Sequence, residues 1–300
     1  MNRHAIIGWI SALFLTLMPW TAAASVPVDI VINNRPMEGD AKAVLQKGAA
    51  VVPLELVGQI PGLSVSWDVP TQTAVIQGGE APIRLVAGSN TAMVGDKPLK
   101  LPFPSKVNQG QMMVPLRFIA EASSASVTWN ASTRTVYVTK SGRELREKLS
   151  SSDLTTARQA ALALPRVSGL QEFPPDPDFM GDQAVTYYFP EGSHDFFFVE
   201  TGDVISYYEP AEDHSERLWS ARVDYRTGQN FDLLPLLPYP IVEENGERPG
   251  ISGRNVFFRI MPHIAAADYG YVDSDGTRTT VGTQKLRGGD ETFALPEEQP

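Results

Sequence analysis

The sequence of 300 residues contains no cysteine, and this absence excludes several kinds of site at once. Disulfide bonds, cysteine-ligated metals, thiol nucleophiles and lipid anchoring through cysteine all need that side chain. Basic residues are also few, since 25 Lys and Arg stand against 35 Asp and Glu and give a net charge of −10. An acidic surface repels phosphate backbones, so we expect no nucleic-acid partner.

Catalytic signatures are missing as well. The four histidines form neither a His-x-His pair nor a His-Glu-x-x-His set for zinc or copper. There is no Gly-x-Ser-x-Gly elbow and no glycine-rich phosphate loop. The segment 192–195 has Ser, His and Asp side by side, but adjacent side chains cannot converge as a triad, so we predict a hairpin turn. We therefore expect no catalytic residue, no cofactor and no metal.

Long apolar runs are absent after the N-terminus. There, a short basic start precedes the apolar stretch Ala5 to Trp20, and an Ala-x-Ala cleavage pattern ends at Ala24. The alternative is an uncleaved anchor, but a membrane-spanning helix needs ~20 apolar residues and this run is shorter. We expect residues 1–24 to be a signal peptide, the protein to be exported to the cell envelope or beyond, and no stable membrane anchor to remain.

What the sequence does contain is an internal repeat with an offset of 62 residues, over about residues 29–77 and 91–139. A constant register without gaps over this length indicates a duplication. The identical pairs are Pro36/Pro98, Gly48/Gly110, Val52/Val114, Pro53/Pro115, Leu54/Leu116, Ser64/Ser126, Val65/Val127, Trp67/Trp129, Thr71/Thr133 and Thr73/Thr135.

Each copy predicts the same succession of a strand, a turn, a helix and a β-hairpin. Pro53 and Pro115 suit the first position of the helix, where no amide hydrogen is required. In the first copy, Pro61-Gly62 ends this helix early. The expected fold class is α+β, with a duplicated β–α–β-hairpin domain over residues 25–140.

The helix of the second copy is expected to be amphipathic. Phe118, Ile119 and Ala122 share one face, whereas Arg117 and Glu121 form an exposed i,i+4 pair. The apolar face indicates a structural role for these residues rather than a chemical one.

Trp67 and Trp129 each follow a valine on the same strand face. They could stack on a ligand such as a wall glycan or pack in the core, and we expect the core because a Trp in this position is usually buried. Together with Pro53, Pro115 and Phe118, they make up the expected structural motif of the repeat.

The long motif of the second copy resembles a known family. Gly-x-x-(Met/Val)-Val-Pro-Leu-Arg-Phe-Ile-Ala-Glu-Ala, followed by Val-x-Trp-(Asp/Asn)-x-x-Thr-x-Thr-Val, is similar to the copper amine oxidase N-terminal-like domain, the stalk domain of many secreted bacterial proteins. The first copy departs from the motif at Glu55, Gly58 and Pro61. The resemblance implies an extracellular, non-catalytic module for spacing or surface binding. It implies no amine oxidation, because those enzymes keep their copper histidines and cofactor tyrosine in a separate domain.

The second half of the chain has a different character and is not assigned to a family. Residues 141–165 predict a helical linker, and 166–287 predict an antiparallel β-rich domain with short strands and short turns. Residues 231–253 are expected to be a long loop, and 288–300 a loose acidic tail.

Aromatic residues are the richest feature of this second half. Phe196 and Phe198 share one strand face, and Phe197 takes the other. One face must be core. The other is either covered by the helix predicted at 157–164 or exposed as a binding surface, and we expect the cover because exposed aromatic patches are uncommon.

Carboxylates crowd the predicted loop at 209–216. Glu209 and Asp213, with Tyr207 beside them, are the candidate ligand contacts, and a solvated charged loop is the alternative. The segment 273–276, Asp-Ser-Asp-Gly, begins like a calcium loop but lacks the bidentate Glu, so we expect a hairpin turn.

The function that these observations favour is a non-catalytic exported scaffold or binding module whose partner is a cell-wall polymer or an envelope protein. One alternative is an extracellular hydrolase with a carboxylate site in the C-terminal half, built from residues such as Glu209 and Asp213. The other is an envelope sensor or inhibitor domain. A deep pocket with paired carboxylates favours the hydrolase, and an open polar or aromatic face favours binding.

Overall fold

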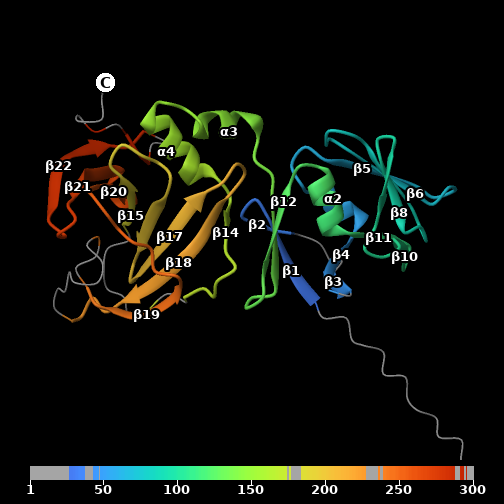
Figure 1. Ribbon diagram of the computed structural model, residues 1–300, viewed down its shortest axis with the longest axis horizontal. Helices are drawn as coiled ribbons and strands as arrows, with labels where there is room; N and C mark the ends of the chain where they lie inside the picture. Colours follow the sequence, from blue (N-terminus) through green and yellow to red (C-terminus); the bar gives the residue numbers. More distant parts are fainter. Residues whose placement is uncertain are drawn as a thin grey trace, which may run out of the picture.

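The computed structural model describes residues 27–37, 43–46, 48–173, 176, 184–227, 236, 239–287, 291–293 and 295. The predicted signal peptide lies outside these residues. The described chain is rich in β-structure, with several sheets and four α-helices. Figure 1 shows two halves side by side along the long axis, blue to green in the first and green through yellow to red in the second. None of the helices described is long and apolar enough to cross a bilayer.

The first half is made of short strands and two short helices. Its elements are β1 (Pro27–Ile32), β2 (Arg35–Pro36), β3 (Ala43–Gln46), β4 (Ala49–Pro53), α1 (Leu54–Val57), β5 (Ser64–Asp68), β6 (Thr73–Gln77), β7 (Ile83–Val86), β8 (Thr91–Val94), β9 (Lys97–Lys100), β10 (Lys106–Asn108), β11 (Gln111–Pro115), α2 (Leu116–Ala122), β12 (Ser126–Asn130) and β13 (Thr135–Thr139). One sheet has the order β10-β11-β4-β3-β1-β13-β12, with β2 beside β1, and another has the order β5-β6-β7-β8-β9.

Elements of the first copy recur 62 residues later. β5 and β6 return as β12 and β13 with corresponding bounds, β4 returns as β11, and α1 and α2 begin at corresponding leucines. The backbone repeats as well: Gly48 and Gly110 have φ of 80° and 82°, and Gln72 and Arg134 have φ of 49° and 56°. Non-glycine residues rarely adopt positive φ, so its recurrence at equivalent positions indicates that both copies use the same turns.

The two copies interlock through shared sheets. β4 pairs antiparallel with its own counterpart β11, and Val52 lies opposite Val114. β1 of the first copy runs parallel to β13 of the second, whereas β8 of the second copy joins β6 of the first through β7. A residue that faces its own counterpart marks a pseudo-two-fold axis, as at an isologous dimer interface. Each copy therefore contributes strands to the sheet of the other.

The prolines lie one residue earlier than expected. Pro53 and Pro115 are the extended residues immediately before α1 and α2, with ψ of 142° and 111°, and they still belong to strands β4 and β11. An extended residue before a helix can end a strand while its carbonyl begins the helix. The i,i+4 pair predicted on α2 is present, with 3.6 Å between Arg117 Nη1 and Glu121 Oε1.

The core of the first half lies between its sheets and helices. Val52, Val114 and Ile119 are fully buried there. Phe118, Trp67 and Trp129 are half-buried and pack against this core, together with several other apolar residues. The tryptophans thus use part of their surface for packing.

The second half is a single large sheet with two helices. Its elements are α3 (Arg143–Leu149), α4 (Leu154–Ala163), β14 (Arg166–Val167), β15 (Val185–Pro190), β16 (Phe197–Thr201), β17 (Val204–Pro210), β18 (Ser215–Val223), β19 (Ile241–Gly246), β20 (Asn255–Met261), the 3₁₀ turn η1 (Pro262–Ile264), β21 (Ala266–Val272) and β22 (Arg278–Lys285). The strand order is β14-β18-β17-β16-β15-β20-β21-β22, with β19 also paired to β18. Only β14 and β18 run parallel among these pairs.

Both faces of this sheet are packed. Phe197 lies in a core with Ala161 and Leu162 of α4, which confirms the helical cover predicted for this face. Phe198 lies in a second core on the opposite face, and Phe196 packs edge-on against it at 6.0 Å between ring centroids. The predicted alternation of the three phenylalanines is therefore confirmed. Figure 1 shows α4 lying across the sheet.

Two expectations for irregular segments were wrong. The segment 231–253 contains strand β19, because pairing with β18 supplies hydrogen bonds that its composition does not predict. In the tail, Thr292 and Leu295 are fully buried, and the Phe293 ring packs 5.2 Å from the Phe258 ring. A short apolar stretch within an acidic segment is enough to anchor these residues. Residues 288–290, 294 and 296–300 lie outside the described chain.

Candidate functional site

The two halves are joined by a buried asparagine at the end of β12. Asn130 donates through Nδ2 to the carbonyl oxygens of Ser168 and Leu170, at 2.8 and 2.9 Å. Its Oδ1 accepts from the amides of Ser132 and Thr133, at 2.9 and 3.1 Å. One fully buried side chain thus closes a turn in the first half and holds a segment of the second. All the hydrogen-bonding groups of its amide are used.

Further hydrogen bonds cross the same junction. The backbone amide of Arg166 donates to Asn34 Oδ1 at 2.8 Å. Ser141 Oγ donates to the carbonyl oxygen of Asp213 at 2.8 Å. Because these contacts come from well-separated parts of the chain, they fix the orientation of the second sheet as well as its distance.

Asp213, one of the predicted ligand contacts, is a buried residue of this junction. Its carboxylate lies 2.7 Å from His214 Nδ1 and accepts hydrogen bonds from Ser126. Burial alone would raise the pKa of this carboxyl, but the hydrogen bonds from His214 and Ser126 outweigh it and lower the pKa. Asp213 is therefore an ionised bridge between the halves.

The other two predicted contacts lie together on β17. Tyr207 Oη donates to Glu209 Oε1 at 2.6 Å, and the ring of Tyr207 packs against Phe196 and Phe198. Burial, followed by the bond to Glu209, raises the pKa of the Tyr207 phenol. Glu209 thus faces Tyr207, whereas Asp213 faces His214, and the structure does not join the two carboxylates in one contact.

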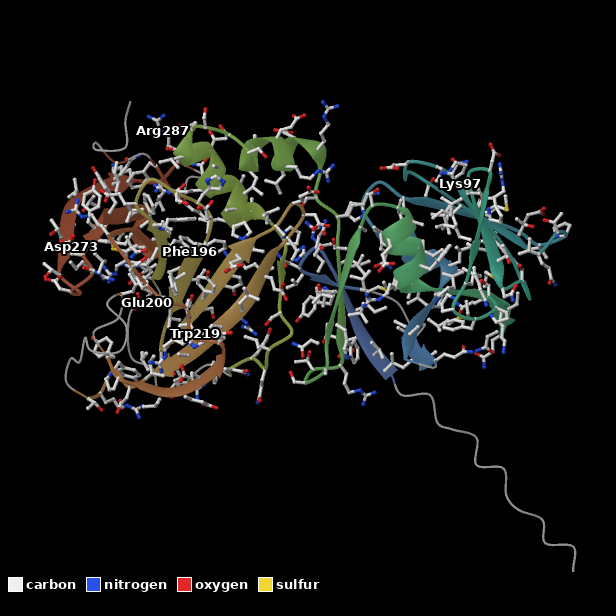
Figure 2. The ribbon with its side chains drawn as sticks, viewed as in Figure 1. Lys97, Phe196, Glu200, Trp219, Asp273 and Arg287 are labelled. Carbon is white, nitrogen blue, oxygen red and sulfur yellow. The ribbon has the colours of Figure 1, made fainter. Side chains whose placement is uncertain are left out.

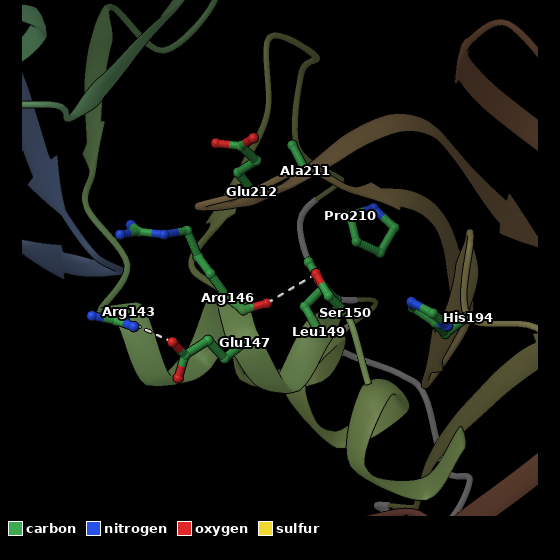
Figure 3. A pocket seen from close by; sticks show the side chains of 9 residues that line it. All are labelled: Arg143, Arg146, Glu147, Leu149, Ser150, His194, Pro210, Ala211 and Glu212. Atoms are coloured by element: carbon green, nitrogen blue, oxygen red, sulfur yellow. Dashed lines mark hydrogen bonds and ion pairs between the residues drawn. The ribbon is translucent and has the colours of Figure 1, made fainter. Parts of the chain in front are cut away.

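A polar groove lies where the halves meet. It consists of two neighbouring cavities of about 730 and 860 Å³, which share Arg146, Ala211 and Glu212. We call this feature the junction groove. Its lining comes mainly from α3, the turn 210–214 between β17 and β18, and residues 124–128 of the first half, and it includes Glu80. Figure 3 shows Arg146 on α3 and Glu212 on the turn above it.

The charged groups of the junction groove differ in how they are paired. Arg143 Nε lies 2.7 Å from Glu147 Oε1, so these two charges balance each other. Arg146 donates through Nη1 to the carbonyl oxygen of Ser141 at 2.7 Å and forms no ion pair with any described residue. The pKa of Lys140 is lowered, with burial as the larger cause and the charge of Arg146 as the smaller one.

A second polar cluster lies inside the large sheet, and sequence reasoning missed it. Tyr188 Oη donates to Glu200 Oε2 at 2.5 Å and accepts from Arg278 Nη2. Burial raises the pKa of Glu200 despite its hydrogen bonds to Tyr188 and Thr186 and the charge of Arg278. These residues come from β15, β16 and β22, so no local motif could reveal them (Figure 2 labels Glu200). The side chains satisfy one another, which is typical of a structural network.

The remaining predicted segments are turns. Residues 192–195 connect β15 to β16, and Ser193 Oγ accepts from the Asp195 amide at 2.9 Å. In the segment 273–276, Asp273 binds Arg254 Nε at 2.8 Å and Asp275 accepts from the Thr277 amide at 2.8 Å. Within the part of the chain that the structure describes, no three His, Asp or Glu side chains gather as a metal site.

Comparison with known families gives one match, which covers most of the first half and continues through α3 and α4. Residues 31–138 and, in an overlapping match, residues 97–164 match the family described as the copper amine oxidase N-terminal domain. The overlap, 97–138, falls within the second copy of the repeat. Together the two matches span residues 31–164, and the matched domain is a non-catalytic, stalk-type domain in its family. The C-terminal half has no family assignment. No curated protein and no solved structure gives a significant match to this chain.

Proposed function

We propose that the chain is an exported, non-catalytic protein of the cell envelope that binds a wall polymer. In this proposal the duplicated hairpin domain is a stalk that holds the second sheet at a fixed orientation. The observation that carries it is the buried contact of Asn130 with Ser168 and Leu170, because a spacer is effective only when its far end cannot swing freely. A fixed arrangement lowers the entropy cost of binding.

The distribution of polar and apolar surface supports binding at the junction. The aromatic side chains of the second half are used for packing on both faces of the sheet. The junction groove, by contrast, is concave and rich in charged and hydroxyl groups. Concave surfaces with convergent polar groups are where ligands usually bind.

The geometry supports binding better than hydrolysis. Two-carboxylate hydrolysis needs paired carboxyl groups, one of them with a raised pKa, across the bond to be cleaved. Glu209 and Asp213 face different partners, and the pKa of Asp213 is lowered.

The experiment is a co-sedimentation assay with purified bacterial cell wall. The chain without residues 1–24 is mixed with wall fragments at physiological salt, and an unrelated acidic protein of similar size is the control. We expect the protein to pellet with the wall in a saturable way while the control stays in solution. A protein that stays in the supernatant at every wall concentration contradicts the proposal.

A further inference from the structure

Arg146 is held in a fixed orientation but its charge is not neutralised. Its Nη1 is bound to the Ser141 carbonyl, which orients the half-buried guanidinium, while Nε and Nη2 have no partner among the described residues. The N–H groups of these two nitrogens point the same way, so they can donate two parallel hydrogen bonds to two oxygens of one anion. The Arg146 guanidinium thus presents an anion contact at the point where the two cavities meet.

Unpaired carboxylates lie in the same groove. Glu80 and Glu212 are exposed and form no ion pair with a described residue, and Glu212 lines both cavities. Neither comes within ion-pairing distance of Arg146, so the opposite charges lie apart across a cavity of about 860 Å³. A ligand between them needs an anionic group for Arg146 and a cationic group for the carboxylates.

The groove offers little to an uncharged sugar. Its described lining contains no Phe, Tyr or Trp, so it lacks the aromatic faces against which the apolar side of a sugar ring could stack. A peptide with both a free carboxylate and a free amino group fits the charges better.

We propose that the junction groove binds the peptide portion of a wall polymer, with a peptide carboxylate on Arg146 and a peptide ammonium group between Glu80 and Glu212. This inference rests on the proposed wall-binding function and names the part of the polymer that is recognised. Because residues of both halves form the groove, the stalk is then part of the binding site as well as its support.

The test compares Arg146→Gln with Lys148→Gln. Lys148 lies on the same helix, outside the groove, and pairs with Glu144 at 2.8 Å, so its substitution removes a similar charge without touching the site. We expect Arg146→Gln to weaken wall binding roughly tenfold or more, as the loss of a charge-assisted bidentate contact does. Lys148→Gln should bind like the wild type. Equal binding by the wild type and Arg146→Gln overturns the proposal, provided that both melt at similar temperatures.

Chemically modified walls identify the ligand groups. Amidation of wall carboxyls should reduce wild-type binding to the level of Arg146→Gln. Acetylation of wall amines should weaken wall binding of the wild type several-fold. The same acetylation should not weaken wall binding of a Glu80→Gln, Glu212→Gln double variant. Removal of phosphate polymers should have no effect. If phosphate removal abolishes binding and amidation does not, Arg146 binds phosphate and the peptide proposal is wrong.

A free peptide separates this inference from the proposed function. The tripeptide Lys-Ala-Ala, with free ends, is titrated into the wild type and into Arg146→Gln, and the shifts of backbone amide signals are followed. We expect shifts at 124–128 and 210–214 in the wild type and none in the variant. Binding of the peptide without binding of the wall would contradict the proposed function alone, whereas binding of the wall without these shifts would contradict the groove assignment alone.

Discussion

The two copies of the repeat have the same strands but different surroundings, and one pair of equivalent residues shows why. Asp68 ends β5 and accepts from Thr71 Oγ1 at 2.5 Å at an exposed turn. Its counterpart Asn130 ends β12, closes the same kind of turn and also donates to Ser168 and Leu170 of the second half. A carboxylate only accepts hydrogen bonds, whereas an amide accepts and donates. Asp68 therefore suits a turn that faces solvent, whereas Asn130 suits a turn that must also bind the second half.

A second equivalent pair shows the same division. Ser64 begins β5 and is exposed, while Ser126 begins β12 and binds the buried carboxylate of Asp213. The helices differ too: α1 spans four residues and α2 seven. Both copies thus build the fold of the first half, and the second copy also makes the contacts of the junction.

The largest expected effect is that of Asn130→Asp. A carboxylate at this position would face two carbonyl oxygens in a buried site, so we expect a loss of about 3–5 kcal/mol in the free energy of unfolding. The matched control Asp68→Asn, at the equivalent exposed turn, should change it by less than about 0.5 kcal/mol. Urea unfolding followed by fluorescence measures both. Similar losses in the two variants would show that the junction contact does not distinguish the copies.

The paired valines test the pseudo-two-fold axis. Val52→Ala and Val114→Ala each remove two fully buried methyl groups, and we expect each to cost about 2 kcal/mol. Because the two residues face each other across the axis, the two losses should agree closely and should not add in the double variant. Strict additivity measured by urea unfolding would argue against their direct packing.

The two serines give a smaller, pH-dependent difference. Ser126→Ala should cost about 1 kcal/mol at pH 7, and Ser64→Ala much less. The folded pKa of Asp213 is lowered, so its contribution to stability is present above the unfolded pKa of about 3.9 and is lost as the pH falls through the folded value. The cost of Ser126→Ala should therefore shrink in acid. Unfolding curves between pH 7 and pH 2 measure it, and a cost that is constant across this range would contradict the assignment.

The exposed ion pair on α2 gives the smallest effect. A double-mutant cycle of Arg117→Ala and Glu121→Ala should give a coupling free energy of about 0.3–0.5 kcal/mol at low salt and less at high salt. The first copy has Glu55 and Gln59 at these positions, so the ion pair of α2 has no counterpart with opposite charges there. A coupling above about 1 kcal/mol on α2 would mean that this helix is less exposed than the structure shows.

Several features of this protein could be predicted from patterns in the sequence. The offset of 62 predicted strands and helices that recur in the structure, and the alternation of Phe196, Phe197 and Phe198 predicted their opposite faces. The prediction for the three phenylalanines succeeds because side-chain direction along a strand follows from backbone geometry alone. The burial of Leu295 was missed, since an apolar stretch as short as 292–295 in an acidic tail carries no periodic signal.

By itself, the sequence determined the turns and the alternation of buried and exposed faces, because each depends on residues close together in the chain. It also determined the duplication, because identical residues recur at a constant offset. Only the tertiary structure decided that β4 pairs with its own counterpart, that Asn130 joins the halves and that Tyr188, Glu200 and Arg278 meet. Such contacts join residues far apart in the chain, and their partners are chosen by the packing of whole sheets. The junction groove belongs to this second group, since its walls exist only once both halves are in place.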